Sequence, residues 1–299
     1  MDIIENDFLI ASFRRNGAEL ASLKSKKNGK EYIFPGIPQF WSKSSPVLFP
    51  IVGCLKNGRF KHKGKEYGMN IHGFANYQDF EISNHTEASI AFILESKGKF
   101  SDIYPFEFEL TIRYRLEENE LIVGYEVVNL SDERMYFSIG GHTAFVCPII
   151  ETDKRNEYFL KFHGIDYLDC SRIDMSCGLL YEEHERIELQ KADTNDKGGI
   201  LRIDDNLFDK DTLIGENYQT HEISLLSPDK APYLSVCFEA PVFGIWSPKG
   251  KAAPFICIVP WYGRCDKKSF DGSLSEREWG NALDIKETFY KEFSIKIFT

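Results

Sequence analysis

Apolar and polar residues alternate with a period of two over much of the chain, most clearly between positions 106 and 127. The even positions from Phe106 to Leu116 are apolar, and the residues between them are polar. After the polar segment EENE (117–120), the apolar residues of the alternation stand at odd positions from Leu121 to Val127. Two alternating runs around a short polar turn predict an antiparallel β-hairpin with one buried and one solvated face.

Short strand-like runs recur along the rest of the chain, whereas helical periodicity is nearly absent. Only residues 275–279 could form a short helical turn. Many short strands without alternating helices predict antiparallel sheets packed on each other. No stretch resembles a linker, so we expect a single all-β domain over residues 1–299. The further predicted strands are 7–13, 31–34, 89–94, 136–139, 158–162, 187–189, 222–226, 234–238, 244–246, 255–258 and 289–298.

Composition and charge narrow the possible partners. The 299 residues include 36 Lys and Arg against 46 Asp and Glu, for a net charge of −10, and 14% are aromatic. This acidic balance argues against nucleic acid, because binding to phosphates depends on clustered Lys and Arg. The acidic start MDIIEND does not resemble a signal peptide. The longest apolar run, 46–55, is too short for the ~20 residues that span a bilayer, so no membrane partner is expected.

The cysteines point to a reducing compartment. There are seven, an odd number, and none forms a CxxC pair, so a structural zinc site of the usual spacing is not expected. Cys237, within the strand-like run SVCF, is typical of a cysteine that packs as a small hydrophobe. We therefore expect a cytoplasmic globular protein that binds no metal.

Three segments stand out from the strand background. The first is SPVLFPIVGCLKNG (45–58), whose prolines exclude a central strand, and it leads to MNIHGFA (69–75). The second, YFSIGGHTAF (136–145), presents His142 directly after two glycines, which permit close backbone approach. The third is GIWSP (244–248), followed by FICIVPWYGRCD (255–266).

Each of these features also has a purely structural interpretation. A single histidine beside glycines is more often a hydrogen-bonded loop residue than a catalyst, and Trp261 could simply fill the core. Two such histidines together with Trp246 and Trp261 favour a sugar site, because such sites need flat apolar faces beside a few fixed polar groups.

The ordered motifs LFPIVG, IHGFA, FSIGGHTAF and GIWSPKG…APFICIVPWYG resemble the aldose 1-epimerase (galactose mutarotase) superfamily, most closely its bacterial galactose mutarotase-related branch. The resemblance covers nearly the whole chain. It implies a large antiparallel β-supersandwich of the galactose mutarotase-like kind, with a free aldohexose or similar sugar in a groove on one sheet.

The resemblance also implies a reaction, the interconversion of sugar anomers. A pyranose is a cyclic hemiacetal, so this needs a base at the anomeric hydroxyl and an acid at the ring oxygen, each worth ~10²–10⁴-fold. No metal or cofactor is required. His142 matches the general acid, and His72 matches the second histidine near the ring oxygen. Asp211 matches an acidic residue that holds sugar hydroxyls, with Asp209 as its competitor.

Two positions depart from the family pattern. The family's general base is a glutamate before the Pro-Trp turn, where this chain has Val259 in CIVP. An arginine of the galactose mutarotases is replaced by Cys54. Lys56, two residues on and so on the same side of an extended chain, could supply the cation instead.

These departures leave several interpretations open. Glu239, Asp266 or a bound water could replace the missing base, although solvated or structural carboxylates are the more usual reading. Trp246, Trp261, Arg264 and Lys56 are expected to contact the sugar. The alternative to an active epimerase is a catalytically impaired sugar-binding or sensing protein. A third interpretation, a phosphorylated substrate held by Lys56, Arg59 and Arg264, has no support from the net charge of −10.

Overall fold

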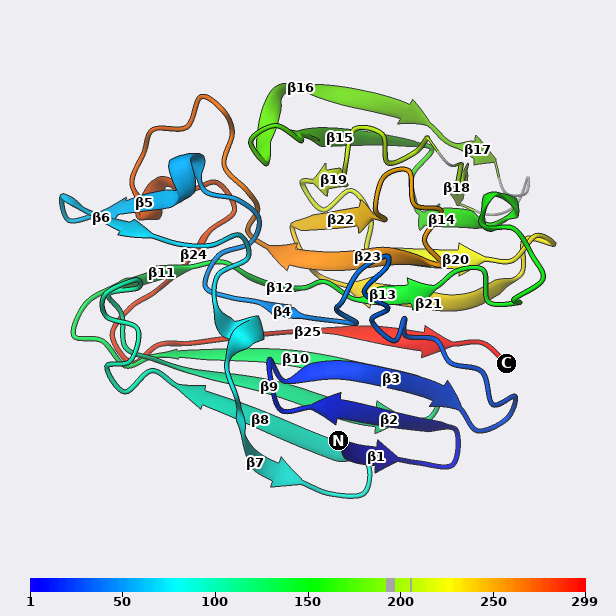
Figure 1. Ribbon diagram of the computed structural model, residues 1–299, viewed down its shortest axis with the longest axis horizontal. Helices are drawn as coiled ribbons and strands as arrows, with labels where there is room; N and C mark the ends of the chain where they lie inside the picture. Colours follow the sequence, from blue (N-terminus) through cyan, green and yellow to red (C-terminus); the bar gives the residue numbers. More distant parts are fainter. Residues whose placement is uncertain (192–196, 205) are drawn as a thin grey trace.

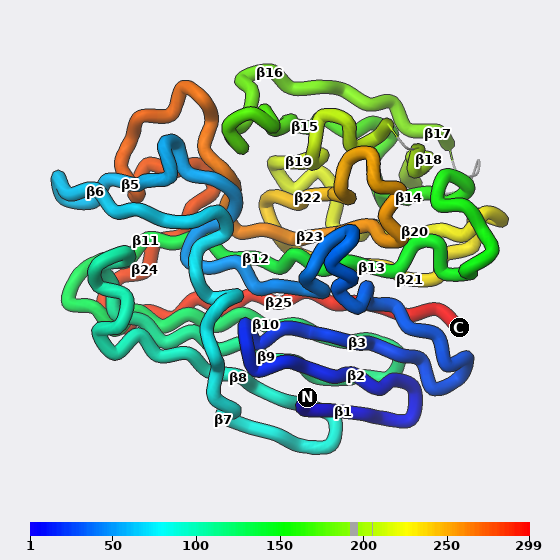
Figure 2. Tube along the Cα trace, in the orientation of Figure 1, coloured from blue at the N-terminus to red at the C-terminus, as the bar shows by residue number. Residues whose placement is uncertain are grey.

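The computed structural model describes residues 1–191, 197–204 and 206–299, and over these residues the fold is all-β (Figure 1). Two large antiparallel sheets form most of it. One has ten strands in the order β17-β18-β14-β20-β21-β25-β10-β9-β8-β7. The other has eight strands, in the order β16-β15-β19-β22-β23-β12-β4, with β13 also paired to β23. Figure 2 shows the same chain as a tube, with the β1–β3 sheet beside strands β8 to β10.

The strands of the ten-stranded sheet are β7 (Glu81–His85), β8 (Ser89–Glu95), β9 (Phe108–Glu117), β10 (Glu120–Asn129), β14 (Phe159–His163), β17 (Gln190–Lys191), β18 (Gly198–Arg202), β20 (Glu222–Leu226), β21 (Pro232–Phe238) and β25 (Thr288–Ile297). Those of the eight-stranded sheet are β4 (Val47–Leu48), β12 (Ile139–Gly141), β13 (Ala144–Val146), β15 (Tyr167–Asp174), β16 (Leu179–Glu188), β19 (Leu213–Glu216), β22 (Val242–Trp246) and β23 (Phe255–Tyr262). The smaller sheets contain β1 (Asp2–Glu5), β2 (Leu9–Arg14) and β3 (Glu19–Ser25), then β5 (Arg59–His62) with β6 (Lys65–Gly68), and β11 (Met135–Phe137) with β24 (Asn281–Leu283). The helical segments are 3-10 turns: η1 (Lys56–Gly58), η2 (Ala75–Tyr77), η3 (Arg155–Glu157) and η4 (Leu274–Glu276).

The predicted hairpin is confirmed as β9 and β10. Leu116 pairs with Leu121 beside the turn, and Leu110 pairs with Val127 toward its open end. These apolar residues are buried in the main core, as the alternation requires. The hairpin lies inside the ten-stranded sheet, between β8 and β25.

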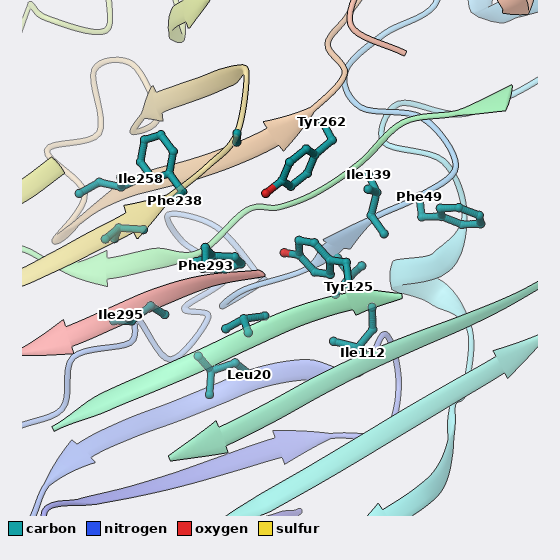
Figure 3. Packing of buried hydrophobic residues seen from close by; sticks show 14 of the residues in the cluster. Leu20, Phe49, Ile112, Tyr125, Ile139, Phe238, Ile258, Tyr262, Phe293 and Ile295 are labelled. Carbon is teal, nitrogen blue, oxygen red and sulfur yellow. The ribbon is translucent and has the colours of Figure 1, made fainter. Parts of the chain in front are cut away.

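The main core fills the space between the two large sheets (Figure 3). Tyr125 from β10 and Tyr262 from β23 point toward each other there, and Ile258 of β23 reaches into the same layer. All three side chains are nearly inaccessible to solvent. Burial of this layer by both sheets fixes which face of β23 points inward.

Strand β23 therefore has an inner and an outer face. Because side chains alternate along a strand, Val259 and Trp261 point away from the main core, opposite to Ile258 and Tyr262. Both belong to a second buried cluster that also includes Cys257 and Leu48. This second cluster underlies the candidate functional site.

The seven cysteines are free thiols. The reducing compartment and the cytoplasmic location stay predictions. In the described part of the chain, no helix is long and apolar enough to cross a membrane.

Candidate functional site

A pocket of about 350 Å³ lies over the outer face of the eight-stranded sheet. Its volume is at the lower end of the ~300–1,000 Å³ typical of small-molecule sites. His72, His142, Asp211, Trp246 and Trp261 all line it. The structure thus brings together five of the seven residues that the sequence analysis proposed, from segments far apart in the chain.

His142 lies between β12 and β13, at the edge of β23. Its backbone N–H donates to the Pro46 carbonyl at 3.0 Å, which ties this turn to the Pro-rich segment. His142 is only 9% exposed, and its Nδ1 atom is buried with no hydrogen-bond partner among the residues that the structure describes. Nε2 is therefore the ring nitrogen available to a ligand. Burial lowers the pKa of His142 to about 4, so the imidazole is neutral at pH 7.

His72 is held by Gly53 through two hydrogen bonds. The Gly53 N–H donates to His72 Nδ1 at 3.0 Å, and the His72 N–H donates to the Gly53 carbonyl, also at 3.0 Å. Because Nδ1 accepts, the neutral ring carries its proton on Nε2. Burial, and to a smaller extent His142, lowers the pKa of His72 to about 3. The rings of the two histidines are 5.6 Å apart, centre to centre.

Close backbone contact sets the position of His72. The next residue, Gly73, has φ of +75°, and a Cβ there would come within 2.3 Å of the Phe49 carbonyl oxygen. Only glycine fits such a position. The N–H groups of Phe74 and Ala75 donate to the same Phe49 carbonyl at 3.0 and 3.1 Å. The segments LFPIVG and IHGFA, separated in sequence, are thereby joined.

Aromatic rings surround His142. The ring centre of Trp41 is 5.0 Å from that of His142, and the ring centre of Trp246 is 5.3 Å away in an edge-on arrangement. Trp41 and Trp246 also contact each other edge-on at 5.6 Å. The sequence analysis did not find Trp41, because it lies in a segment with no strand periodicity. This apolar surround explains the low pKa of His142, since it excludes the water that would stabilise an imidazolium.

Trp261 lies along the sheet and helps to cover Val259. Its Nε1 donates to the Gly141 carbonyl at 3.0 Å. A Cβ built on Gly244 would come within 2.6 Å of Trp261 Cη2 and 2.9 Å of Val259 Cγ2, so both side chains lie over Gly244. Val259 is fully buried. The position expected to carry the general base is therefore apolar and closed to solvent.

Asp211 lines the pocket, whereas its competitor Asp209 lines a different cavity. Asp211 has φ of +61°, and its Oδ1 accepts hydrogen bonds from Thr212 N at 2.7 Å and Thr212 Oγ1 at 2.8 Å. Among the residues that the structure describes, it is the only Asp or Glu that lines this pocket.

Lys56 lies outside this pocket and lines a separate cavity. The prediction assumed an extended chain after Cys54, but residues Lys56–Gly58 form the turn η1, and the assumption was wrong. Cys54 itself lines the pocket. The pocket's cation is instead Lys43, whose Nζ donates to the Asn76 carbonyl at 3.1 Å and lies 5.0 Å from the centre of the Tyr77 ring. The sequence analysis missed Lys43 and Asn76, since neither lies in a recognised motif.

Arg264 also does not line the pocket. It is buried and donates through Nε to Glu216 Oε2 at 3.0 Å, and it forms a second ion pair with Glu278. Ser171 Oγ and Trp279 Nε1 donate to Glu216 at 2.7 and 2.8 Å. Burial alone would raise the pKa of Glu216, but Arg264 and these donors outweigh it and lower the pKa. Arg264 is thus bound within this cluster, outside the pocket that holds His142.

The two proposed replacement bases lie elsewhere. Asp266 is buried and bonded to Arg277 Nε at 2.7 Å and to the Lys56 N–H at 2.9 Å. Glu239 is exposed and lies 3.4 Å from His221 Nδ1. Neither lines the pocket. No group of three or more His, Cys, Asp or Glu among the described residues is placed to hold a metal ion, and a reaction without metal or cofactor stays a prediction.

Comparisons with known proteins show the family of the chain. The aldose 1-epimerase family model matches residues 3–271. The plasmid-encoded protein LacX of Lactococcus lactis subsp. lactis is 30% identical over 292 residues, covering 95% of this chain and 91% of LacX.

Solved structures show the same fold. A galactose mutarotase related enzyme from Lactobacillus acidophilus matches with a TM-score of 0.89 and 33% identity, over 100% of this chain and 97% of that one. A galactose mutarotase-like protein from Lactobacillus casei ATCC 334 matches with a TM-score of 0.88 and 25% identity, over 100% of both chains. With its β-sandwich fold and a family match over nearly its whole length, the chain belongs to the aldose 1-epimerase family.

Proposed function

We propose that the protein binds a free aldohexose or a similar sugar in this pocket and interconverts its anomers by acid–base ring opening. The observation that carries the proposal is the pairing of His142 and His72 in one pocket with Asp211 and the flat faces of Trp246 and Trp261. Apolar ring faces can pack against a pyranose, while a few fixed polar groups orient its hydroxyls.

His142 is the proposed general acid, delivering a proton to the ring oxygen from Nε2. Full proton transfer needs the imidazolium form, which the apolar surround disfavours. A negative charge at Asp211 favours that form when the two groups act across one sugar. His72, with its proton fixed on Nε2, is proposed to donate a supporting hydrogen bond near the same oxygen.

Mutarotation of anomerically pure sugars tests this function. The rates for glucose, galactose and related aldoses should be measured by polarimetry with wild-type protein, with His142→Ala and with buffer alone. We expect wild-type protein to exceed buffer for at least one sugar, and His142→Ala to lose ~10²–10⁴-fold of that excess. Equal rates for protein, variant and buffer across the panel would exclude catalysis.

A second candidate function is sugar binding or sensing with impaired catalysis, and Val259 is the observation that favours it. Valine cannot accept a proton, and here it is fully buried beneath neighbouring side chains. Loss of one proton-transfer partner removes a rate factor of ~10²–10⁴ and leaves binding intact. Val259→Glu separates the two functions. A large gain in mutarotation would favour the impaired protein, whereas no gain would place the base elsewhere.

A further inference from the structure

We infer that Asp211 is the proton acceptor of the reaction, taking the part that Val259 cannot play. This inference rests on the proposed function and concerns the chemistry within the same pocket. The family resemblance assigns Asp211 only to holding sugar hydroxyls, so a catalytic role goes beyond that assignment.

The other carboxylates near the site already bind partners within the protein. Glu216 already accepts hydrogen bonds from Ser171, Arg264 and Trp279. Asp266 is committed to Arg277. Within residues 1–191, 197–204 and 206–299, Asp211 alone presents a carboxylate to the pocket.

Hydrogen bonds within a turn hold Asp211 in place. A turn places it, since its N–H donates to the Phe208 carbonyl at 3.0 Å. Thr212 anchors Oδ1 with two hydrogen bonds, of 2.7 and 2.8 Å. Oδ2 has no hydrogen-bond partner or ion pair among the described residues. A carboxylate with one oxygen fixed and the other open is oriented to accept a proton from a ligand.

Asp211 and His142 lie at different strands of the eight-stranded sheet. Asp211 precedes β19 and His142 follows β12, and the order of the sheet puts β22 and β23 between these strands. Three strand spacings put at least about 14 Å between the two backbones. Asp211 and His142 line one pocket of about 350 Å³ together with Trp246 and Trp261, so both can contact a single sugar bound there.

The proposed step conserves protons and electron pairs. Asp211 Oδ2 takes the proton of the anomeric hydroxyl, the bond between C1 and the ring oxygen breaks, and the C1–O bond becomes a carbonyl. The His142 imidazolium gives its proton to the departing ring oxygen. After rotation about the C1–C2 bond, the ring oxygen attacks the other face of the carbonyl. His142 then regains its proton, and Asp211 returns its own to the anomeric oxygen.

Asp211→Asn tests this role, with Asp209→Asn as the matched control from the same turn. The asparagine keeps an oxygen that can accept from Thr212, so the turn should be preserved, and circular dichroism would check folding. Using a sugar that wild-type protein turns over, we expect Asp211→Asn to lose ~10²–10⁴-fold in kcat with KM changed less than fivefold. Asp209→Asn should behave as wild type.

Other outcomes would overturn the inference. If Asp211→Asn raises KM while kcat is unchanged, Asp211 only holds the sugar, and the proposed epimerase function survives without it. If wild-type protein does not exceed the buffer rate with any sugar, the proposed function fails and this role fails with it.

Discussion

His142 lies opposite Val259 on the neighbouring strand β23. Gly140 pairs with Trp261, and Ala144 pairs with Cys257. His142 is midway between Gly140 and Ala144. Val259 is midway between Cys257 and Trp261, so it falls opposite His142. The acid histidine and the valine in the expected base position are therefore neighbours across one strand spacing. This relationship sets the chemistry of the site, because the charge that would stabilise an imidazolium is missing from the adjacent position.

Substitution of Val259 tests how closed that position is. Val259→Glu places a carboxylate where no surface is exposed, so burial should raise the pKa of the new side chain. We expect this variant to lose several kcal/mol of unfolding free energy at pH 7 and to recover part of it at pH 5, where the carboxyl binds a proton more readily. Thermal unfolding at both pH values measures this, with Val259→Gln as the uncharged control. A Val259→Glu protein as stable as wild type at pH 7 would show that water reaches the site.

The two histidines should make stability depend on pH. Their pKa values in the folded protein are about 4 for His142 and about 3 for His72, below the ~6.5 of an unfolded chain. The unfolded state therefore binds more protons below pH 6.5, and stability must fall as pH falls. At pH 5 we expect a loss of about 2 kcal/mol for each histidine relative to pH 7.

Denaturant unfolding of the double variant His72→Asn/His142→Asn tests whether these two histidines cause the pH dependence of stability. Its stability should change less between pH 7 and pH 5 than that of wild type. An unchanged slope in the double variant would contradict the assignment of low pKa values to these two side chains.

The close contact between Gly73 and the Phe49 carbonyl helps to place His72. It predicts that alanine substitution at two glycines will cost different amounts of stability. Gly73→Ala adds a Cβ 2.3 Å from the Phe49 carbonyl oxygen at φ of +75°, whereas Gly64 has a similar φ of +77° and no atom within 4 Å of its Cβ position. We expect Gly64→Ala to cost the ~1–2 kcal/mol of a left-handed backbone, and Gly73→Ala to cost clearly more. Thermal unfolding of both variants measures the difference. Equal losses of stability would mean that Gly73 is not tightly packed against the Phe49 carbonyl.

The alternation of apolar and polar residues along the sequence predicted much of the fold. The alternation in β9 and β10 identified a central hairpin, because one face of each strand is buried. Strand β16 was found only at its end, in the predicted run 187–189, since most of its residues are exposed and no apolar face marks it. The single domain over residues 1–299 stays a prediction.

The site was only partly predictable, for a different reason. His72, His142, Asp211, Trp246 and Trp261 lie in or beside recognisable motifs, and they line one pocket. Lys56 and Arg264 also lie near motifs, but a turn diverts the first and the buried Glu216 binds the second. Trp41 and Lys43 reach the pocket only through tertiary packing, which no local pattern encodes.

The pH dependence of kcat/KM for wild-type mutarotation tests the central claim most directly. His142 must be protonated to act as general acid, and its pKa in the free pocket is about 4. We therefore expect kcat/KM, after subtraction of the buffer rate, to increase as pH is lowered from 8 to 5, because the profile reports groups of the free enzyme. A kcat/KM that increases with pH over this range, or the same profile in His142→Ala, would contradict the account.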